Sequence, residues 1–154
     1  MKIIESLRHK LNKNAELSGQ EKETNKIINK FLEKTNPDVH YKNVGGYGII
    51  AIYKGVEEGK NILLRADIDG LNIPMNCQQY LGAGTEFKVQ CQSQYQYSHR
   101  CGHDGHAAIL CGVAMHLGKK RPQKGNVILL FQPAEETGEG AKAVINDPQF
   151  QDLK

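Results

Sequence analysis

The sequence has no long apolar run. None of its stretches approaches the roughly 18 consecutive apolar residues of a membrane-spanning helix, which argues against a membrane protein. Residues 1–8 carry charged side chains, but no apolar core of a signal peptide follows them. Asn-x-Ser/Thr glycosylation sites are also absent. We therefore expect a cytoplasmic protein without a membrane partner.

A strong excess of charge is lacking as well. The net charge is only +3, and the 20 Lys and Arg residues are dispersed, which argues against nucleic acid as a partner. The densest basic run, Lys119-Lys120-Arg121, follows a predicted helix, where cations interact favourably with the negative end of the helix dipole. A binding patch is the alternative interpretation of this run. A length of 154 residues and a hydrophobic content of 39% suit one globular domain with a buried core.

Cysteines are few. The chain has four, and this even number permits a disulfide framework: Cys77, Cys91, Cys101 and Cys111. Because the sequence carries no export signal, reduced thiols in the cytosol are the better interpretation. Such thiols are available as metal ligands.

Hydrophobic periodicity predicts helices that alternate with strands. The first two expected helices cover residues 3–14 and the stretch from a capping box at Ser18 and Glu21 to Asn36-Pro37. The other expected elements are a β-hairpin at 39–44 and 48–53, a buried strand at 61–67, a helix at 105–117, a central strand at 126–131 and a helix within 138–146. This order is typical of an α/β layer fold with a mixed sheet, in which sites form beyond the carboxyl ends of strands.

Metal-ligating side chains gather at two of these element ends. Cys101 and His103 precede the helix predicted at 105–117, which has His106 in its first turn, and Glu135-Glu136 follow the predicted central strand. A soft thiolate, a borderline imidazole and a hard carboxylate together suit a zinc-like or manganese-like ion. Neighbouring residues at a strand end point in opposite directions, so one glutamate can bind the ion while the other acts as a base. The pattern predicts metal-assisted hydrolysis.

Two other possible sites fail on spacing. Asp67 and Asp69 lie on the same side of a strand end, but Leu71 stands at the fifth position of the loop that they would open, which excludes an EF-hand. Residues 112–120 imitate a phosphate loop. That stretch has one residue too many and carries Lys120 where Ser or Thr should bind magnesium, so the interpretation is rejected.

Three stretches resemble consecutive blocks of one enzyme family. They read LRADIDGL at 64–71, HRCGHDGH at 99–106 and FQPAEE at 131–136, in matching order and with similar spacing. The chain resembles the amidohydrolase branch of the aminoacylase/carboxypeptidase metallopeptidases, which includes hippurate hydrolases, N-acyl-amino-acid amidohydrolases and indole-acetyl-amino-acid hydrolases. The resemblance runs from about Ser18 to the C-terminus and implies a mixed-sheet, three-layer α/β metallopeptidase catalytic domain.

The resemblance implies a role for each candidate residue. It makes Cys101, His103 and Glu136 ligands of a divalent ion, zinc or manganese, with up to two ions in a complete site. Glu135 becomes the general base, which takes a proton from water and protonates the leaving amine. Sister branches carry His at the position of Asp67, so Asp67 and Asp69 support the ligands. The implied substrate is an N-acyl amino acid.

The resemblance also implies that residues 1–154 are the N-terminal part of the catalytic domain. The family's lid or dimerisation domain and its two later histidine ligands have no counterpart in the sequence, so we expect an open apolar sheet edge, and a homodimer only for a longer parent. A non-catalytic remnant and a peptidase for short peptides are alternatives to the amidohydrolase. The sequence departs from the family at Asn72, at Arg100 and in the long Gln- and Tyr-rich segment 76–98.

Overall fold

Within the residues that the structure describes, the centre of the protein is a four-stranded mixed sheet. The computed structural model describes residues 2–72 and 97–153. In spatial order, the strands of the sheet are β1 (Val39–Val44), β2 (Gly48–Lys54), β6 (Lys124–Gln132) and β3 (Glu57–Asp67). Strand β2 pairs antiparallel with β1 and β6, whereas β3 runs parallel to β6. A separate short ladder joins β4 (Leu71–Asn72) to β5 (Tyr97–Ser98).

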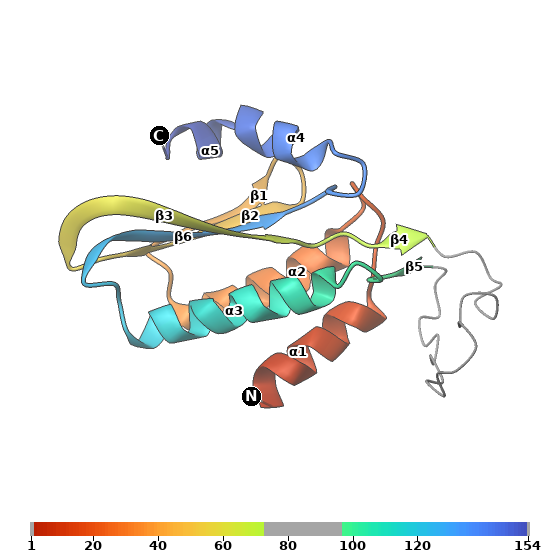
Figure 1. Ribbon diagram of the computed structural model, residues 1–154, viewed down its shortest axis with the longest axis horizontal. Coiled ribbons are helices and arrows are strands. Elements are labelled where there is room, and N and C mark those ends of the chain that lie inside the picture. The colour runs from red at the N-terminus through yellow and green to blue at the C-terminus, as the bar shows by residue number, and fades with distance from the viewer. Residues whose placement is uncertain (1, 73–96, 154) are drawn as a thin grey trace.

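Helices cover both faces of this sheet (Figure 1). One face carries α1 (Lys2–Lys13), α2 (Lys22–Leu32) with the short 3-10 helix η1 (Glu33–Thr35) that continues it, and α3 (His103–Lys119). The opposite face carries α4 (Gly140–Asn146) and α5 (Pro148–Gln151). The mixed sheet and the three-layer α/β fold predicted from the sequence are confirmed.

Strands β2 and β6 are apolar on both faces because helices cover each face. Towards α1, α2 and α3, the fully buried side chains include Ile49 and Tyr53 of β2 and Phe131 of β6. The alternate residues pack against α4 in a second core, whose buried members are Val44, Ile50, Ile52, Ile128, Leu130 and Val144. These two cores hold the carboxyl end of β6, where the predicted glutamate pair follows.

Strand β3 is more exposed than its sequence suggests. Ile62, Leu63 and Leu64 expose 58%, 42% and 38% of their surface, so the prediction of a buried strand at 61–67 is wrong. The physical reason is position, since in the described part of the chain β3 has a neighbour on one side only. This arrangement agrees with the open apolar sheet edge expected from the resemblance.

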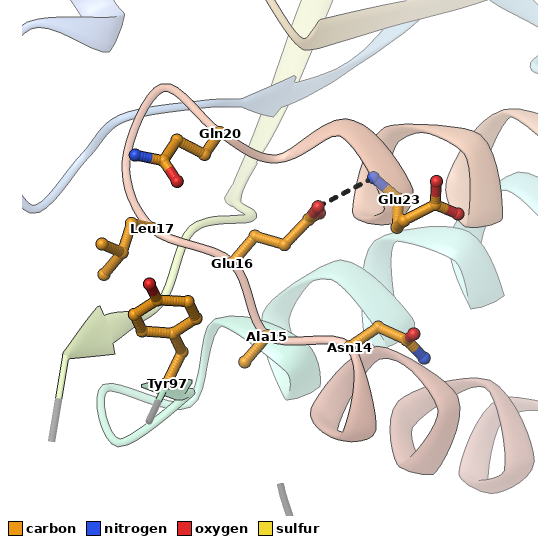
Figure 2. A pocket seen from close by; sticks show the side chains of 7 residues that line it. All are labelled: Asn14, Ala15, Glu16, Leu17, Gln20, Glu23 and Tyr97. Atoms are coloured by element: carbon orange, nitrogen blue, oxygen red, sulfur yellow. Dashed lines mark hydrogen bonds between the residues drawn. The ribbon is translucent and has the colours of Figure 1, made fainter. Parts of the chain in front are cut away.

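The start of α2 is capped differently from the prediction. Ser18 and Glu21 were expected to form a capping box, but the helix begins one residue after Glu21, with no side-chain cap bond from that residue. The carboxylate of Glu16 instead accepts the backbone N–H groups of Glu23 and Thr24, at 3.1 and 2.9 Å (Figure 2). The two side chains of the predicted box have other partners: the hydroxyl of Ser18 donates to Asp69, and the carboxylate of Glu21 accepts the backbone N–H groups of Gly19 and Ala134.

The described residues bear on the expectations about membrane helices and cysteines. Among the helices of residues 2–72 and 97–153, none is long and apolar enough to cross a membrane. Cys101 and Cys111 are free thiols, while Cys77 and Cys91 lie outside the described residues. The Gln- and Tyr-rich segment also lies outside them, apart from Tyr97 and Ser98 of β5.

Candidate metal centre

The predicted site residues come from the ends of two parallel strands and the start of one helix. Asp67 is the last residue of β3 and pairs in register with Gln132, the last residue of β6. The loop after β6 carries Glu135 and Glu136, and the loop after β3 carries Asp69. Because the two strands are parallel, both loops leave the sheet at the same edge, as the sequence pattern predicted.

Helix α3 begins earlier than expected and brings His103 into its first turn. The predicted start was residue 105, but the helix starts at His103, with Gly102 as its N-cap in the left-handed region at φ 82°. The carbonyl oxygen of Gly102 accepts the N–H groups of Gly105 and His106, at 2.9 and 3.0 Å. A glycine tolerates this φ without strain, and the resulting tight turn sets Cys101 beside His103.

The structure brings the three predicted ligands together. One ligand atom each from Cys101, His103 and Glu136 lies within 4.8 Å of the other two. Nε2 of His103 is 3.8 Å from Oε2 of Glu135 and 3.9 Å from Oε1 of Glu136. His103 is buried and Cys101 is exposed, so the group lies at the surface with one buried wall.

This donor set fits a divalent ion of borderline softness. It combines one sulfur, one imidazole nitrogen and one carboxylate oxygen, a mixture found at zinc and related sites. Oε1 of Glu136 is buried and has no hydrogen-bond partner within the described residues. A buried carboxylate oxygen without a donor is costly, and a cation beside it would remove that cost.

A hydrogen bond from its other nitrogen orients His103. Nδ1 of His103 lies 2.9 Å from the backbone carbonyl oxygen of Asp69. Because a carbonyl oxygen can only accept, Nδ1 carries the proton, and neutral His103 keeps its lone pair on Nε2. That is the nitrogen that faces Glu135 and Glu136, and this arrangement is typical of metal-binding histidines.

Asp69 connects the three loops around this group. Its side chain is fully buried, and Oδ2 accepts the hydroxyl of Ser18 at 2.7 Å and the backbone N–H of Glu136 at 3.0 Å. Its backbone carbonyl oxygen also accepts a hydrogen bond from Nδ1 of His99, at 3.0 Å. Asp69 therefore lies behind the candidate ligands and contacts their supporting backbone.

Asp67 lies differently from Asp69. It is partly buried, and its Oδ1 forms an ion pair with the guanidinium of Arg65. One of its carboxylate oxygens also lies within 4.8 Å of ring nitrogens of His103 and His106. Asp67 is thus on the His106 side of the turn and does not belong to the group that contains Cys101.

Glu136 perturbs the thiol of Cys101. A hydrogen bond between the two side chains, followed by slight desolvation of the thiol and the nearby negative charges, raises the pKa of Cys101 to about 11. The protein without a cation therefore holds this group as the thiol at neutral pH. A bound cation reverses the effect, because thiolate is the form that binds metal.

Sequence reasoning missed several supporting residues. Glu21 is fully buried and accepts the N–H of Ala134 at 2.8 Å, which fixes the loop before the glutamate pair. Burial raises the pKa of Glu21 and lowers that of His99. The only signals were the capping-box pattern for Glu21 and the HRCGHDGH block for His99, and neither pattern names the partner.

Helix α1 is also attached to this region. Asp104, in the first turn of α3, is almost fully buried and pairs with Nε of Arg8 at 2.8 Å. Its Oδ2 also accepts Nδ2 of Asn12 at 2.9 Å. Both partners belong to α1, so the N-terminal helix helps to hold the start of α3.

A cavity of about 280 Å³ lies beside the site but does not contain the candidate ligands. It is bounded by the loop that includes Asn14 and Leu17 and by Tyr97 of β5 (Figure 2). The backbone of this loop is joined to Gly70, whose N–H donates to the carbonyl oxygen of Glu16 at 2.7 Å. The cavity therefore adjoins the segment that supports Asp69.

Comparison with known proteins gives consistent matches. The model of peptidase family M20/M25/M40 matches residues 63–153. An N-acetylcysteine deacetylase of Bacillus subtilis is 39% identical over 141 residues, which are 91% of this chain and 35% of that protein. A hippurate hydrolase of Campylobacter jejuni is 34% identical over 148 residues, 96% of this chain and 36% of that protein.

A solved structure is similar along nearly the whole chain. It is a dinuclear metal-binding peptidase of the M20 family from Bacillus subtilis, with a TM-score of 0.80 and 34% sequence identity. The match covers 99% of this chain and 40% of that protein. The chain thus spans well under half the length of the known proteins to which it is similar.

Proposed function

Since the chain belongs to peptidase family M20/M25/M40, whose model matches residues 63–153, we propose that it supplies the metal-binding part of an amidohydrolase. The proposed reaction is hydrolysis of the amide bond of N-acyl amino acids. The observation that carries the proposal is the grouping of ligand atoms from Cys101, His103 and Glu136 within 4.8 Å, with Glu135 beside them.

Three side chains hold the ion in this proposal. Cys101 gives a thiolate, His103 its Nε2 and Glu136 a carboxylate oxygen, which suits zinc or manganese. When bound, the divalent ion supplies Lewis-acid chemistry, because it polarises the amide carbonyl and makes water more acidic. The dinuclear metal-binding peptidase from Bacillus subtilis supports a divalent metal for this chain.

The two glutamates differ in exposure, and this difference supports different roles. The side chain of Glu135 is 40% exposed, whereas that of Glu136 is 20% exposed with a buried Oε1. The more exposed Glu135 is the one that can reach water and substrate, so it acts as the general base. It accepts a proton from water as the oxygen adds to the amide carbon, and it returns that proton to the nitrogen as the C–N bond breaks.

The names of the relatives support the substrate class. One is an N-acetylcysteine deacetylase and another is a hippurate hydrolase, so both act on an acyl group bound to an amino acid. We extend this class to the present chain as a small-molecule N-acyl amino acid. The chain spans 35% and 36% of those two proteins, so we propose that it forms one part of a catalytic domain.

A chimera tests the function. Residues 1–154 would replace the matching segment of the Bacillus subtilis N-acetylcysteine deacetylase, of which they cover 35%. We expect hydrolysis of N-acetylcysteine that a metal chelator abolishes and that Glu135→Gln removes. A folded chimera that binds zinc or manganese but shows no chelator-sensitive hydrolysis would contradict the proposal. Glu139→Gln, at an exposed carboxylate of the same loop, is the matched control and should leave the rate unchanged.

A further inference from the structure

A second group of possible metal ligands shares His103. One carboxylate oxygen of Asp67 and one ring nitrogen each of His103 and His106 lie within 4.8 Å of one another. The sequence predicts only a structural role for His106, at the start of the helix. The structure gives it a more specific position.

His106 is turned towards the site and not along the helix surface. It follows His103 by three residues in α3, and side chains at this spacing are neighbours on one helix face. The two ring centroids are 5.5 Å apart. A Cβ added to Gly102 would lie 3.9 Å from Nε2 of His106, so this ring extends back over the turn between Cys101 and His103.

Each of the three side chains has one atom to offer. Nδ1 of His103 donates to the carbonyl oxygen of Asp69, which leaves only Nε2. Oδ1 of Asp67 pairs with Arg65, which leaves Oδ2. The exposed His106 ring lets an ion arrive from solvent. Two imidazoles and one carboxylate form a ligand set that binds zinc, cobalt(II) or iron(II).

We propose that Asp67, His103 and His106 form an alternative divalent-cation site that competes with the group containing Cys101 and Glu136. The competition follows from His103, because its single available lone pair on Nε2 can bind only one ion at a time. The inference rests on the proposed function only through this shared histidine. It assigns Asp67 and His106 as ligands of an ion, in addition to the three residues of the first group.

Cobalt(II) distinguishes the two positions, since a thiolate ligand gives a charge-transfer band in the near ultraviolet and imidazole and carboxylate ligands do not. The key variant is Cys101→Ala with Glu136→Gln, which removes two ligands of the first group and leaves the second group intact. We expect this double variant to lose the charge-transfer band and to retain one bound cobalt ion per chain with visible d–d bands. Adding His106→Gln should abolish that binding.

The matched control is His116→Gln in the same double variant. His116 is an exposed histidine of the same helix, so its loss should leave cobalt binding unchanged. A folded double variant that binds no cobalt, or one that binds equally well after His106→Gln, would overturn the proposal. Circular dichroism establishes folding in each case.

A second measurement covers a double variant that fails to fold. In the otherwise unchanged chain, His106→Gln removes the competing position, so the thiolate band per bound cobalt ion should rise, whereas His116→Gln should not alter it. An unchanged band in His106→Gln contradicts the competition. A thiolate band that is absent from both the unsubstituted chain and His106→Gln, although the unsubstituted chain binds cobalt, would instead contradict the role of Cys101 in the proposed function. A loss of cobalt binding on His106→Gln would in that case still identify His106 as a ligand.

Discussion

Oδ2 of Asp69 lies 3.0 Å from the backbone nitrogen of Glu136, so the loop after β3 holds the loop after β6 by a charge-assisted hydrogen bond. The same aspartate contacts His103 through its carbonyl oxygen. One buried residue therefore sets the positions of two candidate ligands that are far apart in sequence.

Replacing this aspartate should weaken metal binding without removing a ligand. For Asp69→Asn we expect a loss of roughly 10- to 100-fold in zinc affinity, the usual effect of losing a supporting contact to metal ligands. Competition with a chromophoric chelator measures the affinity. Asp152→Asn, at an exposed carboxylate in the C-terminal region, is the control and should bind zinc as the unsubstituted chain does. Equal affinity for both variants would contradict a supporting role for Asp69.

Metal binding should release a proton from Cys101. Its pKa is raised to about 11, so the thiol is protonated at neutral pH and an ion must displace that proton. Because binding of the ion releases this proton, the apparent affinity for the ion should rise with pH. We expect a rise of about tenfold per pH unit between neutral pH and the pKa of the thiol. Calorimetry in buffers of different ionisation enthalpy counts the protons released. Cys101→Ala should release one proton fewer per ion, and an identical count in both proteins would contradict thiolate ligation.

The glutamate pair should give two distinct phenotypes in the chimera. Glu135→Gln should keep its metal and lose roughly two to four powers of ten in hydrolysis rate, the usual contribution of a general base. Glu136→Gln should lose metal, because it removes a ligand. Metal content by mass spectrometry and initial rates separate the two effects. Exchanged phenotypes would reverse the roles assigned from the exposure of the two side chains.

Much of the fold was predictable because local pattern and sheet position agree. The Gly45-Gly46 turn between two apolar runs predicted the hairpin of β1 and β2, and the continuous apolar run at 126–131 predicted the central strand β6. The burial of β3 was not predictable. The exposure of its apolar side chains depends on which elements lie beside the strand. The residue pattern of a single strand does not reveal those neighbours.

The site was predictable only to the extent that its residues are near one another in sequence or carry a known motif. The family resemblance is confirmed by the match to peptidase family M20/M25/M40, while the metal roles of Cys101, His103 and Glu136 stay predictions. The hydrogen bonds from Ser18 to Asp69 and from Ala134 to Glu21 join residues 51 and 113 positions apart. No local pattern specifies such partners.

The isolated chain should be inactive as an amidohydrolase. We expect that purified residues 1–154 with added zinc, manganese or cobalt hydrolyse N-acetyl and N-benzoyl amino acids no faster than the same metals alone. A hydrolytic two-metal site needs enough ligands to hold both ions and still leave a position for water. The first candidate group offers three ligands, and the second shares His103 with it, so the two groups cannot together hold two ions.

Partial coverage of a similar enzyme also supports the expected inactivity of the isolated chain. The chain covers 40% of the solved dinuclear peptidase to which it is similar, and its strand β3 leaves Ile62 58% exposed. An apolar strand at a sheet edge favours association of chains, so the assay should be made on a fraction of defined size from gel filtration. A parallel sample with chelator reports any hydrolysis that does not depend on metal. Chelator-sensitive turnover by a fraction that contains only this chain would contradict the prediction, because it would mean that two copies, or residues outside the two groups, complete the site.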